Sequence, residues 1–242
     1  MKTIPAIVLA WMLLGIQAAE VCANDYYKNP QARKVADAIL DAYGGVGNIL
    51  KTTRLKTVIS LVRGTNQAQM VCYQTKDKLR LDSDPPATPS QIWDGTQAVL
   101  VENGVAKPAP EAVKTQLVRL QTEGVGQQDL VRRFLNERNW LKYQGLAAYD
   151  HRPHYLFESH NAQGAVVRHY FDQQTALERV EVTLGKAGVE SREFVAHTRF
   201  KDVLYPSRIV LRDSQARVTG QMEILKLSDD FDDSVFTPGT GK

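Results

Sequence analysis

The chain has 242 residues and a formal net charge of +3, from 30 basic and 27 acidic side chains. The basic residues are interleaved with acidic ones along the whole sequence, which argues against a nucleic-acid-binding stripe and against a nucleic-acid partner. The length allows one sizeable β-rich domain or two small ones.

The first 23 residues have the pattern of a cleavable export signal. Lys2 supplies a positive start, residues 4–16 form an apolar run, and Val21-Cys22-Ala23 offers small residues for cleavage. The apolar run is shorter than the roughly 20 residues that span a bilayer, although a retained membrane anchor is the alternative. We therefore predict a signal peptide at 1–23 and a periplasmic protein, secreted through the inner membrane and soluble after cleavage. The lack of ATP in that compartment argues against kinases, NTPases and most nicotinamide enzymes.

The sequence has two cysteines. Cys22 lies within the predicted signal, so cleavage after Ala23 leaves Cys72 as the only thiol, and a lone thiol cannot form an internal disulfide. Cys72 lies in a stretch that predicts a strand, which favours a buried, inert thiol over a reactive one. Cleavage after Ala18 or Ala19 would leave Cys22 available to pair with Cys72, and both alternatives stay open.

A helix opens the mature chain and strands follow it. Asn29 can cap this helix, Pro30 suits its first turn, and Gly44-Gly45 ends it. Its apolar positions recur at helical spacing at Val35, Ala38, Ile39 and Ala42. A further helical turn is predicted at 46–51, and Asp94-Gly95 is a hairpin-turn signal. The strands predicted in this part are 55–63, 67–73, 78–82, 91–96 and 97–102.

Residues 108–138 interrupt the strand pattern. Gly124-Val125-Gly126 divides them into two short amphipathic helices, each with an apolar face that needs a surface to cover. The apolar positions are Val113, Leu117 and Leu120 in the first helix and Leu130, Val131, Phe134 and Leu135 in the second. Strands then resume at 142–148, 154–160, 165–172, 177–185, 190–201, 207–213 and 217–227. Their short connections predict antiparallel neighbours.

The pattern predicts an α+β fold with one large, curved antiparallel sheet of about 11–12 strands. Such a sheet curls to limit its exposed edges, and the helices must fill or cover its apolar face. Two interpretations are equally compatible with this arrangement: a lined cavity for an apolar ligand, or a dry core completed by the helices. The cavity interpretation assigns Val182, Phe194 and Met222 to the wall and Leu117, Leu120, Leu130 and Phe134 to the covering helices.

No residue pattern in the sequence indicates catalysis or a cofactor. His151 and His154 have no acidic or cysteine partner at ligand spacing, and a metal site needs three or four convergent ligands. The acidic run 229–233 lacks the turn glycine and distal carboxylate of a calcium loop, and we interpret it as a solvated loop anchored by Phe231 and Phe236. No Gly-x-Ser-x-Gly motif occurs. We expect no enzyme activity, no cofactor and no metal.

Several segments in order resemble the periplasmic lipoprotein-carrier superfamily, the LolA/LolB-like proteins. These segments are Ala42-Tyr43-Gly44-Gly45 with the strand 55–64, Ile92-Trp93-Asp94-Gly95-Thr96, residues 168–172 with 176–180, residues 200–209, and the closing stretch from Met222 to Pro238. The resemblance covers nearly all of residues 24–242 and implies a single domain. It implies an open half-barrel with a helical lid, at about 108–138, over a cavity for acyl chains.

On this basis we expect a periplasmic carrier of lipids or acylated lipoproteins. The alternative is a protein-interaction or envelope-sensing module of the same fold, like the sensor domain of the regulator that holds an anti-sigma factor. The expected partners are a lipid or an acylated lipoprotein, with an inner-membrane complex as a further candidate, and the protein is expected to be a monomer. Gly124 and Gly126 are the predicted hinge of the lid, because glycine tolerates large backbone changes.

Overall fold

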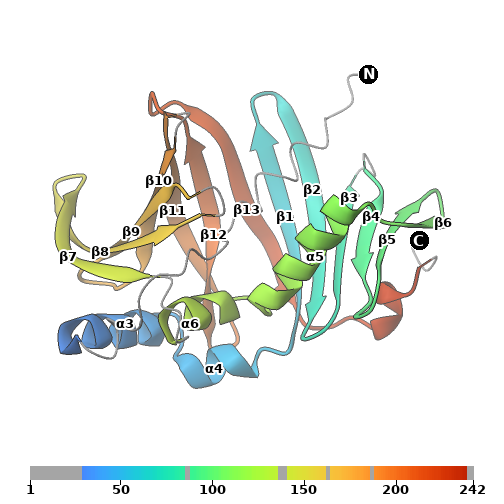
Figure 1. Cartoon of the computed structure of the whole chain (residues 1–242), viewed down its shortest axis with the longest axis horizontal. Helices are drawn as coiled ribbons and strands as arrows, with labels where there is room; N and C mark the ends of the chain where they lie inside the picture. The colour runs from blue at the N-terminus through green and yellow to red at the C-terminus, as the bar shows by residue number, and fades with distance from the viewer. Residues whose placement is uncertain (1–28, 85–87, 136–140, 162–163, 186–187, 239–242) are drawn as a thin grey trace. The chain divides into compact units, whose positions relative to one another are not determined.

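The computed structural model describes residues 29–238 except 85–87, 136–140, 162–163 and 186–187 (Figure 1). The predicted signal peptide at 1–23 lies outside the described residues and stays a prediction. Among the helices of the described part, none is both long enough and apolar enough to cross a membrane.

The described chain forms a single antiparallel sheet of thirteen strands, which confirms the predicted α+β class. Along the sheet the strand order is β6-β5-β4-β3-β2-β1-β13-β12-β11-β10-β9-β8-β7. The strands are β1 (Arg54–Arg63), β2 (Asn66–Thr75), β3 (Leu79–Asp84), β4 (Ser90–Trp93), β5 (Ala98–Glu102), β6 (Val105–Pro108), β7 (Lys142–Tyr149), β8 (Arg152–His160), β9 (Val166–Asp172), β10 (Glu178–Gly185), β11 (Gly188–Phe200), β12 (Val203–Arg212) and β13 (Val218–Ser228).

The strand that the sequence analysis missed is β6. Asn103 and Gly104 have φ angles of 51° and 77°, and Glu102 pairs with Val105 across them. Two residues with positive φ make a tight hairpin turn, for which Asn-Gly is a preferred pair. The dipeptide therefore starts another hairpin at the edge of the sheet, where Pro108 at the end of β6 is tolerated.

Within the described residues, four α-helices and one 3-10 helix accompany the sheet: α3 (Pro30–Ala42), α4 (Val46–Lys51), α5 (Glu111–Glu123), α6 (Gln128–Leu135) and η2 (Asp233–Phe236). The Asn29 side chain caps α3 as predicted, by accepting from the amides of Gln31 and Ala32. The buried face of α3 is slightly rotated from the predicted one: Ala36 and Leu40 are buried, whereas Ala38 is exposed.

The chain divides into two compact units. In the described part, unit 1 comprises residues 51–128 and 222–238, and unit 2 comprises residues 29–50 and 129–221. Unit 1 contains β1–β6 with α5 and η2, and unit 2 contains α3, most of α6 and β7–β12. The prediction of a single domain for 24–242 stays a prediction.

In unit 1 the C-terminal segment is fastened to the strands by two arginines. The Arg54 guanidinium stacks on Phe231, 4.3 Å from the ring centroid, and donates to the Phe231 carbonyl. Arg80 Nη1 donates to the Val235 carbonyl at 2.6 Å, and Phe236 is buried. The acidic run 229–233 thus belongs to an anchored loop.

In unit 2 the end of α3 contacts the turn between β11 and β12 very closely. The Tyr43 carbonyl accepts from Leu204 N at 2.9 Å. A Cβ on Gly44, which has a φ of +118°, would lie 2.1 Å from the Asp202 carbonyl oxygen. Glycine is therefore required at position 44 both for its backbone conformation and for the space it leaves.

Candidate functional site

The helix α5 of unit 1 lies on an apolar surface formed by β3, β4 and β5 (Figure 1). Leu117 is fully buried at the centre of this contact. The buried floor beneath it consists of Leu79, Leu81 and Ala98, and the surrounding half-buried residues are Cys72, Trp93, Ala109, Val113 and Leu120. We call the strand residues of this set, Cys72, Leu79, Leu81, Trp93 and Ala98, the α5 seat. Its chemistry is apolar throughout, so α5 is held there by non-directional contacts.

Side-chain hydrogen bonds fix the C-terminal end of α5. The Gln74 side chain on β2 donates to the carbonyls of Leu120 and Gly124, at 3.4 and 2.9 Å. Gln121 also donates from its side chain to the Lys76 carbonyl. At the other end the N-cap position is Pro110, which makes no side-chain capping hydrogen bond, and the preceding Ala109 amide donates to the Ala98 carbonyl of β5 at 2.9 Å. Side chains of the strands thus hold the C-terminal end of α5, and a backbone hydrogen bond holds the segment before its N-terminal end.

The predicted hinge follows the C-terminal end of α5. Gly124 and Gly126 have φ angles of +90° and +61°, and a Cβ on Gly124 would lie 2.7 Å from Gln128 Oε1. The intervening Val125 is fully buried, and Gln128 Nε2 donates to the Thr52 carbonyl at 2.8 Å. The local backbone thus requires glycine whether or not the segment moves, and the hinge role stays a prediction.

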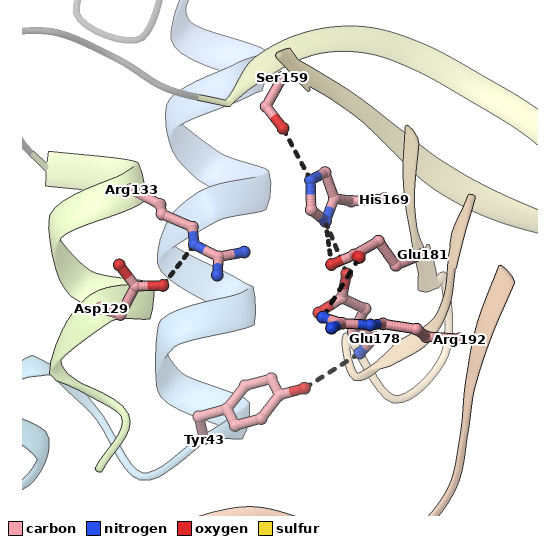
Figure 2. Close-up of polar contacts among 8 residues, drawn as sticks. All are labelled: Tyr43, Asp129, Arg133, Ser159, His169, Glu178, Glu181 and Arg192. Atoms are coloured by element: carbon pink, nitrogen blue, oxygen red, sulfur yellow. Dashed lines mark hydrogen bonds and ion pairs between the residues drawn. The ribbon is translucent and has the colours of Figure 1, made fainter. Parts of the chain in front are cut away.

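The helix α6 rests on a different kind of surface, a polar cluster on β8–β11 of unit 2 (Figure 2). His169 is at its centre and is 1% exposed. Its Nδ1 lies 2.8 Å from Glu178 Oε1 and 3.9 Å from Glu181 Oε2, and its Nε2 lies 3.0 Å from Ser159 Oγ. Because a carboxylate only accepts, Nδ1 carries the proton in the neutral ring and Nε2 accepts from the Ser159 hydroxyl.

We call the cluster of Ser159, His169, Glu178 and Glu181 the α6 seat. Charged side chains from β11 and from α6 itself lie beside it. Arg192 Nη1 on β11 lies 3.5 Å from Glu181 Oε1. From α6, Arg133 Nε donates to Asp129 Oδ2 at 2.5 Å, one turn away along the helix. The Tyr43 hydroxyl accepts from the Glu178 amide at 3.2 Å. Hydrogen bonds and ion pairs thereby join Tyr43, the C-cap of α3, to a cluster that spans four strands, and Arg133 of α6 acts on Glu178 and Glu181 through its charge (Figure 2).

The pKa shifts show how these charges compensate one another. Burial alone lowers the pKa of the Arg133 guanidinium, but the nearby carboxylates, led by Asp129, more than reverse this and raise it. Burial alone would raise the pKa of the Glu181 carboxyl. The positive charges of Arg192, His169 and Arg133 outweigh burial, so the pKa of Glu181 is lowered. Arg133 is therefore a counter-charge that α6 brings to the carboxylates of the sheet.

Two chemical roles suggest themselves for this cluster. Ser159, His169 and Glu178 are connected in the order of a hydrolase triad, yet Ser159 is 3% exposed and is closed to a substrate carbonyl in this structure. His169, Glu178 and Glu181 could hold a metal, since one ligand atom of each lies within 4.8 Å of the others. Each of them already has a partner, and the two neighbouring arginines oppose a cation. The arrangement is better explained as the charged seat of a helix.

Strand register shows which predicted cavity residues lie together. Leu117 and Leu120 belong to the face of α5 that packs on the α5 seat. Met222 is half-buried on β13 in the same unit. In unit 2, Leu130 and Phe134 are the buried face of α6, and Phe134 packs on Phe157 and Phe171, with ring centroids 5.2 and 5.9 Å apart.

Val182 lies on the other face of the sheet from Phe134. Phe157 pairs with His169 and His169 with Glu181, so the face that α6 covers carries Glu181. Val182 pairs instead with Arg168, which forms an ion pair with Glu158 at 2.9 Å. Phe194 is buried and lines a polar cleft that is described below. The structure therefore does not bring the seven residues together around one cavity, and the cavity stays a prediction.

Sequence reasoning missed the polar cluster, although a signal for it exists. His169 alternates with Val167 and Phe171, and all three are buried. A histidine inside an alternating apolar row faces the core and needs a partner there. Its carboxylate partners lie across the β9–β10 hairpin, where a bulge between Glu178 and Val180 shifts the register. The bulge makes the partner impossible to count from the sequence.

Solved structures show what this fold is similar to. A domain provisionally assigned to outer membrane lipoprotein sorting, from Vibrio parahaemolyticus, matches with a TM-score of 0.54 at 8% identity, covering 84% of this chain and 95% of that one. A LolA superfamily protein from Nitrosomonas europaea matches with a TM-score of 0.51 at 11% identity, covering 84% and 97%. The chain therefore has a LolA-like fold.

The match to the crystal structure of MucB, at 10% identity, covers 83% of this chain and 59% of the MucB chain. Its TM-score of 0.30 is too low to support an argument. No protein-family sequence model matches the chain, and no curated protein matches it in sequence. The similarity thus establishes the fold alone.

Proposed function

We propose that the protein is a periplasmic carrier that binds the acyl chain of a lipid or lipoprotein in the α5 seat, in place of α5. The observation that supports this proposal is the apolar contact between α5 and strands β3–β5. A surface that holds a helix through Leu, Ala, Trp and Cys side chains can hold an alkyl chain by the same contacts. The LolA-like fold, shared with a domain assigned to lipoprotein sorting, agrees with this function.

The apolar energies of the two occupants are of the same order. Burying one methylene contributes about 0.8 kcal/mol, so an acyl chain with about a dozen methylenes contributes on the order of 10 kcal/mol. Releasing Val113, Leu117 and Leu120 costs about 5–9 kcal/mol, at roughly 1.5–3 kcal/mol for each buried side chain. A long chain can therefore compete with the covering helix for the apolar floor.

Opening would start at the N-terminal end of α5. Pro110 leaves that end without a side-chain cap, whereas Gln74 holds the carbonyls at the other end. The helix would pivot about Gln74 and the adjoining Gly124-Val125-Gly126 segment. In this proposal the protein binds and transfers its ligand without chemistry, as a monomer that needs no cofactor.

A titration with a fluorescent fatty acid tests the proposal through two variants with opposite expected effects. Leu117→Ala weakens the helix that competes for the seat, so the probe should bind more tightly than to the unmodified protein. Leu81→Asn damages the floor that both occupants use, so the probe should bind more weakly. Circular dichroism spectra and unfolding curves establish that both variants are folded.

Two results would contradict carriage. One is a folded protein that neither binds the probe nor carries lipid in native mass spectrometry of material from the cell envelope. The other is a pair of variants that change affinity in the same direction. A single stoichiometric protein partner in place of lipid would support the protein-interaction module instead.

A further inference from the structure

A polar cleft of about 560 Å³ opens in unit 2 where β10 and β11 separate. The two strands are paired from Gly185–Gly188 up to Val180–Glu193, and the pairing ends there. Each strand has a register shift beside this point, between Glu178 and Val180 on β10 and between Phe194 and Ala196 on β11.

The extra residues at these two shifts are Arg179 and Val195, and both line the cleft. Bulges re-aim side chains and are frequent beside functional sites. Two bulges on neighbouring strands therefore build one recess and direct an arginine into its lining.

The β7–β8 turn forms another part of the lining. Tyr149 pairs with Arg152 across a two-residue turn made by Asp150 and His151. These turn residues have φ angles of 47° and 59°, a region in which glycine or asparagine is usual for such a turn. Non-glycine residues persist there at a cost in free energy. The turn sets Tyr149 and Arg152 at the same end of the cleft.

The lining of the cleft includes three arginines, Arg152, Arg179 and Arg212, and three carboxylates, those of Asp150, Asp172 and Glu193. Arg212 is occupied by Glu193, with Nε and Nη2 at 2.8 and 3.1 Å from its carboxylate. Asp172 Oδ1 caps its own turn by accepting from Thr175 N at 2.8 Å and from Gln174 N at 3.0 Å.

Arg152 and Arg179 have no ion-pair or hydrogen-bond partner for their guanidinium groups in the part of the chain that the structure describes. The pKa of the nearby His197 is lowered by burial and, in addition, by the positive charge of Arg179. The charge of Arg179 therefore acts on a group inside the unit and is not neutralised by an ion-pair partner among the described residues.

From this geometry we infer that the cleft binds a small molecule bearing a phosphate or carboxylate group, held by Arg152 and Arg179 with Tyr149 against the rest of the ligand. Guanidinium groups match the planar and bidentate acceptors of these anions. The volume is that of a small-molecule site, which is more than a bare ion needs. The shared chemistry is an oxyanion on a body the size of a sugar or glycerol headgroup. This inference does not depend on the acyl site of unit 1.

Calorimetric titration of the purified protein with glycerol 3-phosphate and with glucuronate tests the two anions, and glycerol and glucose are the neutral controls. We expect at least one anion to bind and neither neutral molecule to do so. Arg179→Gln and Arg152→Gln should each weaken binding about tenfold or more, since each removes a charge-assisted contact. Arg208→Gln is the matched control, because Arg208 is an exposed arginine of β12 that donates to the Gln221 side-chain oxygen at 3.2 Å and does not line the cleft.

Vesicles containing phosphatidylglycerol form a further arm. Binding of vesicles but not of glycerol 3-phosphate, lost in Arg179→Gln, would assign the oxyanion to a lipid headgroup; binding of the soluble anion would assign it to a free metabolite. The inference is overturned if no anion or vesicle binds. It is also overturned if Arg208→Gln weakens binding as much as Arg179→Gln, with all variants unfolding at the same temperature.

Discussion

The seats of α5 and α6 differ in the forces that hold each helix. The α5 seat is apolar, with Leu117 buried among leucines and alanine. The α6 seat combines an aromatic contact at Phe134 with a charged cluster in which Arg133 faces two carboxylates of β10. An apolar surface accepts any apolar occupant, whereas buried charges demand one specific partner. This difference supports the proposal that α5 is exchanged for a ligand while α6 stays in place.

The largest effect is expected from breaking the charged seat. Arg133→Met keeps the length of the side chain, leaves Asp129 without its ion-pair partner and removes one of the positive charges near Glu178 and Glu181, so unfolding free energy should fall by about 3 kcal/mol. Arg132→Met, at the exposed neighbouring position, should change it by less than about 0.5 kcal/mol. Urea titration measures both. Equal, small changes in the two variants would mean that the cluster does not hold α6.

The apolar seat should open locally, before the whole protein unfolds. Burial raises the pKa of the Cys72 thiol to about 12, with a further contribution from Asp82, so a maleimide should react slowly while α5 covers the seat. Leu117→Ala should lower the cost of opening by about 2 kcal/mol and speed labelling by about 30-fold. Unfolding free energy should fall by a similar amount, because the open and the unfolded chain both lack the Leu117 contact. If both proteins are labelled only at the rate that global unfolding allows, α5 is ordinary core.

Gln74 sharpens the same contrast at the anchored end of α5. Gln74→Leu preserves packing but removes two hydrogen bonds to helix carbonyls, each contributing about 1 kcal/mol or less. Labelling of Cys72 should rise about five- to tenfold, which is less than for Leu117→Ala. Gln69→Leu, also on β2 but with no side-chain hydrogen bond to α5 in the described part of the chain, is the control and should leave the labelling rate unchanged. A larger effect from Gln69→Leu than from Gln74→Leu would place the anchor elsewhere.

The smallest expected effects are on the pH dependence of stability, which should differ between the two seats. The pKa of Glu181 is lowered in the folded protein, so its contribution is present above the unfolded value of about 4.3 and is lost as the pH falls below it. The pKa of Cys72 is raised, so its contribution is present below the unfolded value of about 8.5 and declines as the pH rises toward about 12.

Hydrogen exchange at several pH values should therefore show acid loosening α6 first and alkali loosening the α5 region first. The reverse order would contradict the assigned causes. Glu181→Gln should remove the acid effect on α6 and leave the alkaline effect on the α5 region in place.

Much of the fold was predictable because strand alternation and short connections are local signals. The helix α3 with its Asn29 cap, both helices of 108–138 and twelve of the thirteen strands follow from such signals. The face that the helices cover is not a local property. Alternation shows that Val180, Val182 and Leu184 share one face, but only the packing of Phe134 on Phe157 shows that α6 covers the other.

The partners of His169 in the polar cluster and the position of the cleft could not be predicted from the sequence, for a related reason. Both depend on β-bulges, at Glu178/Val180 and at Phe194/Ala196, which change register by one residue and so change which side chains face each other. Nothing in the sequence near Arg179 or Val195 signals these shifts.

Hydrogen exchange followed by mass spectrometry, with and without a saturating fatty acid, tests most directly whether α5 yields its seat to an acyl chain. Residues 111–123 should lose protection when the ligand binds, strands β3–β5 should keep theirs, and α6 should not change. A loss of protection in α6 with α5 unchanged would contradict the exchange of α5. So would a bound fatty acid that leaves residues 111–123 as protected as before.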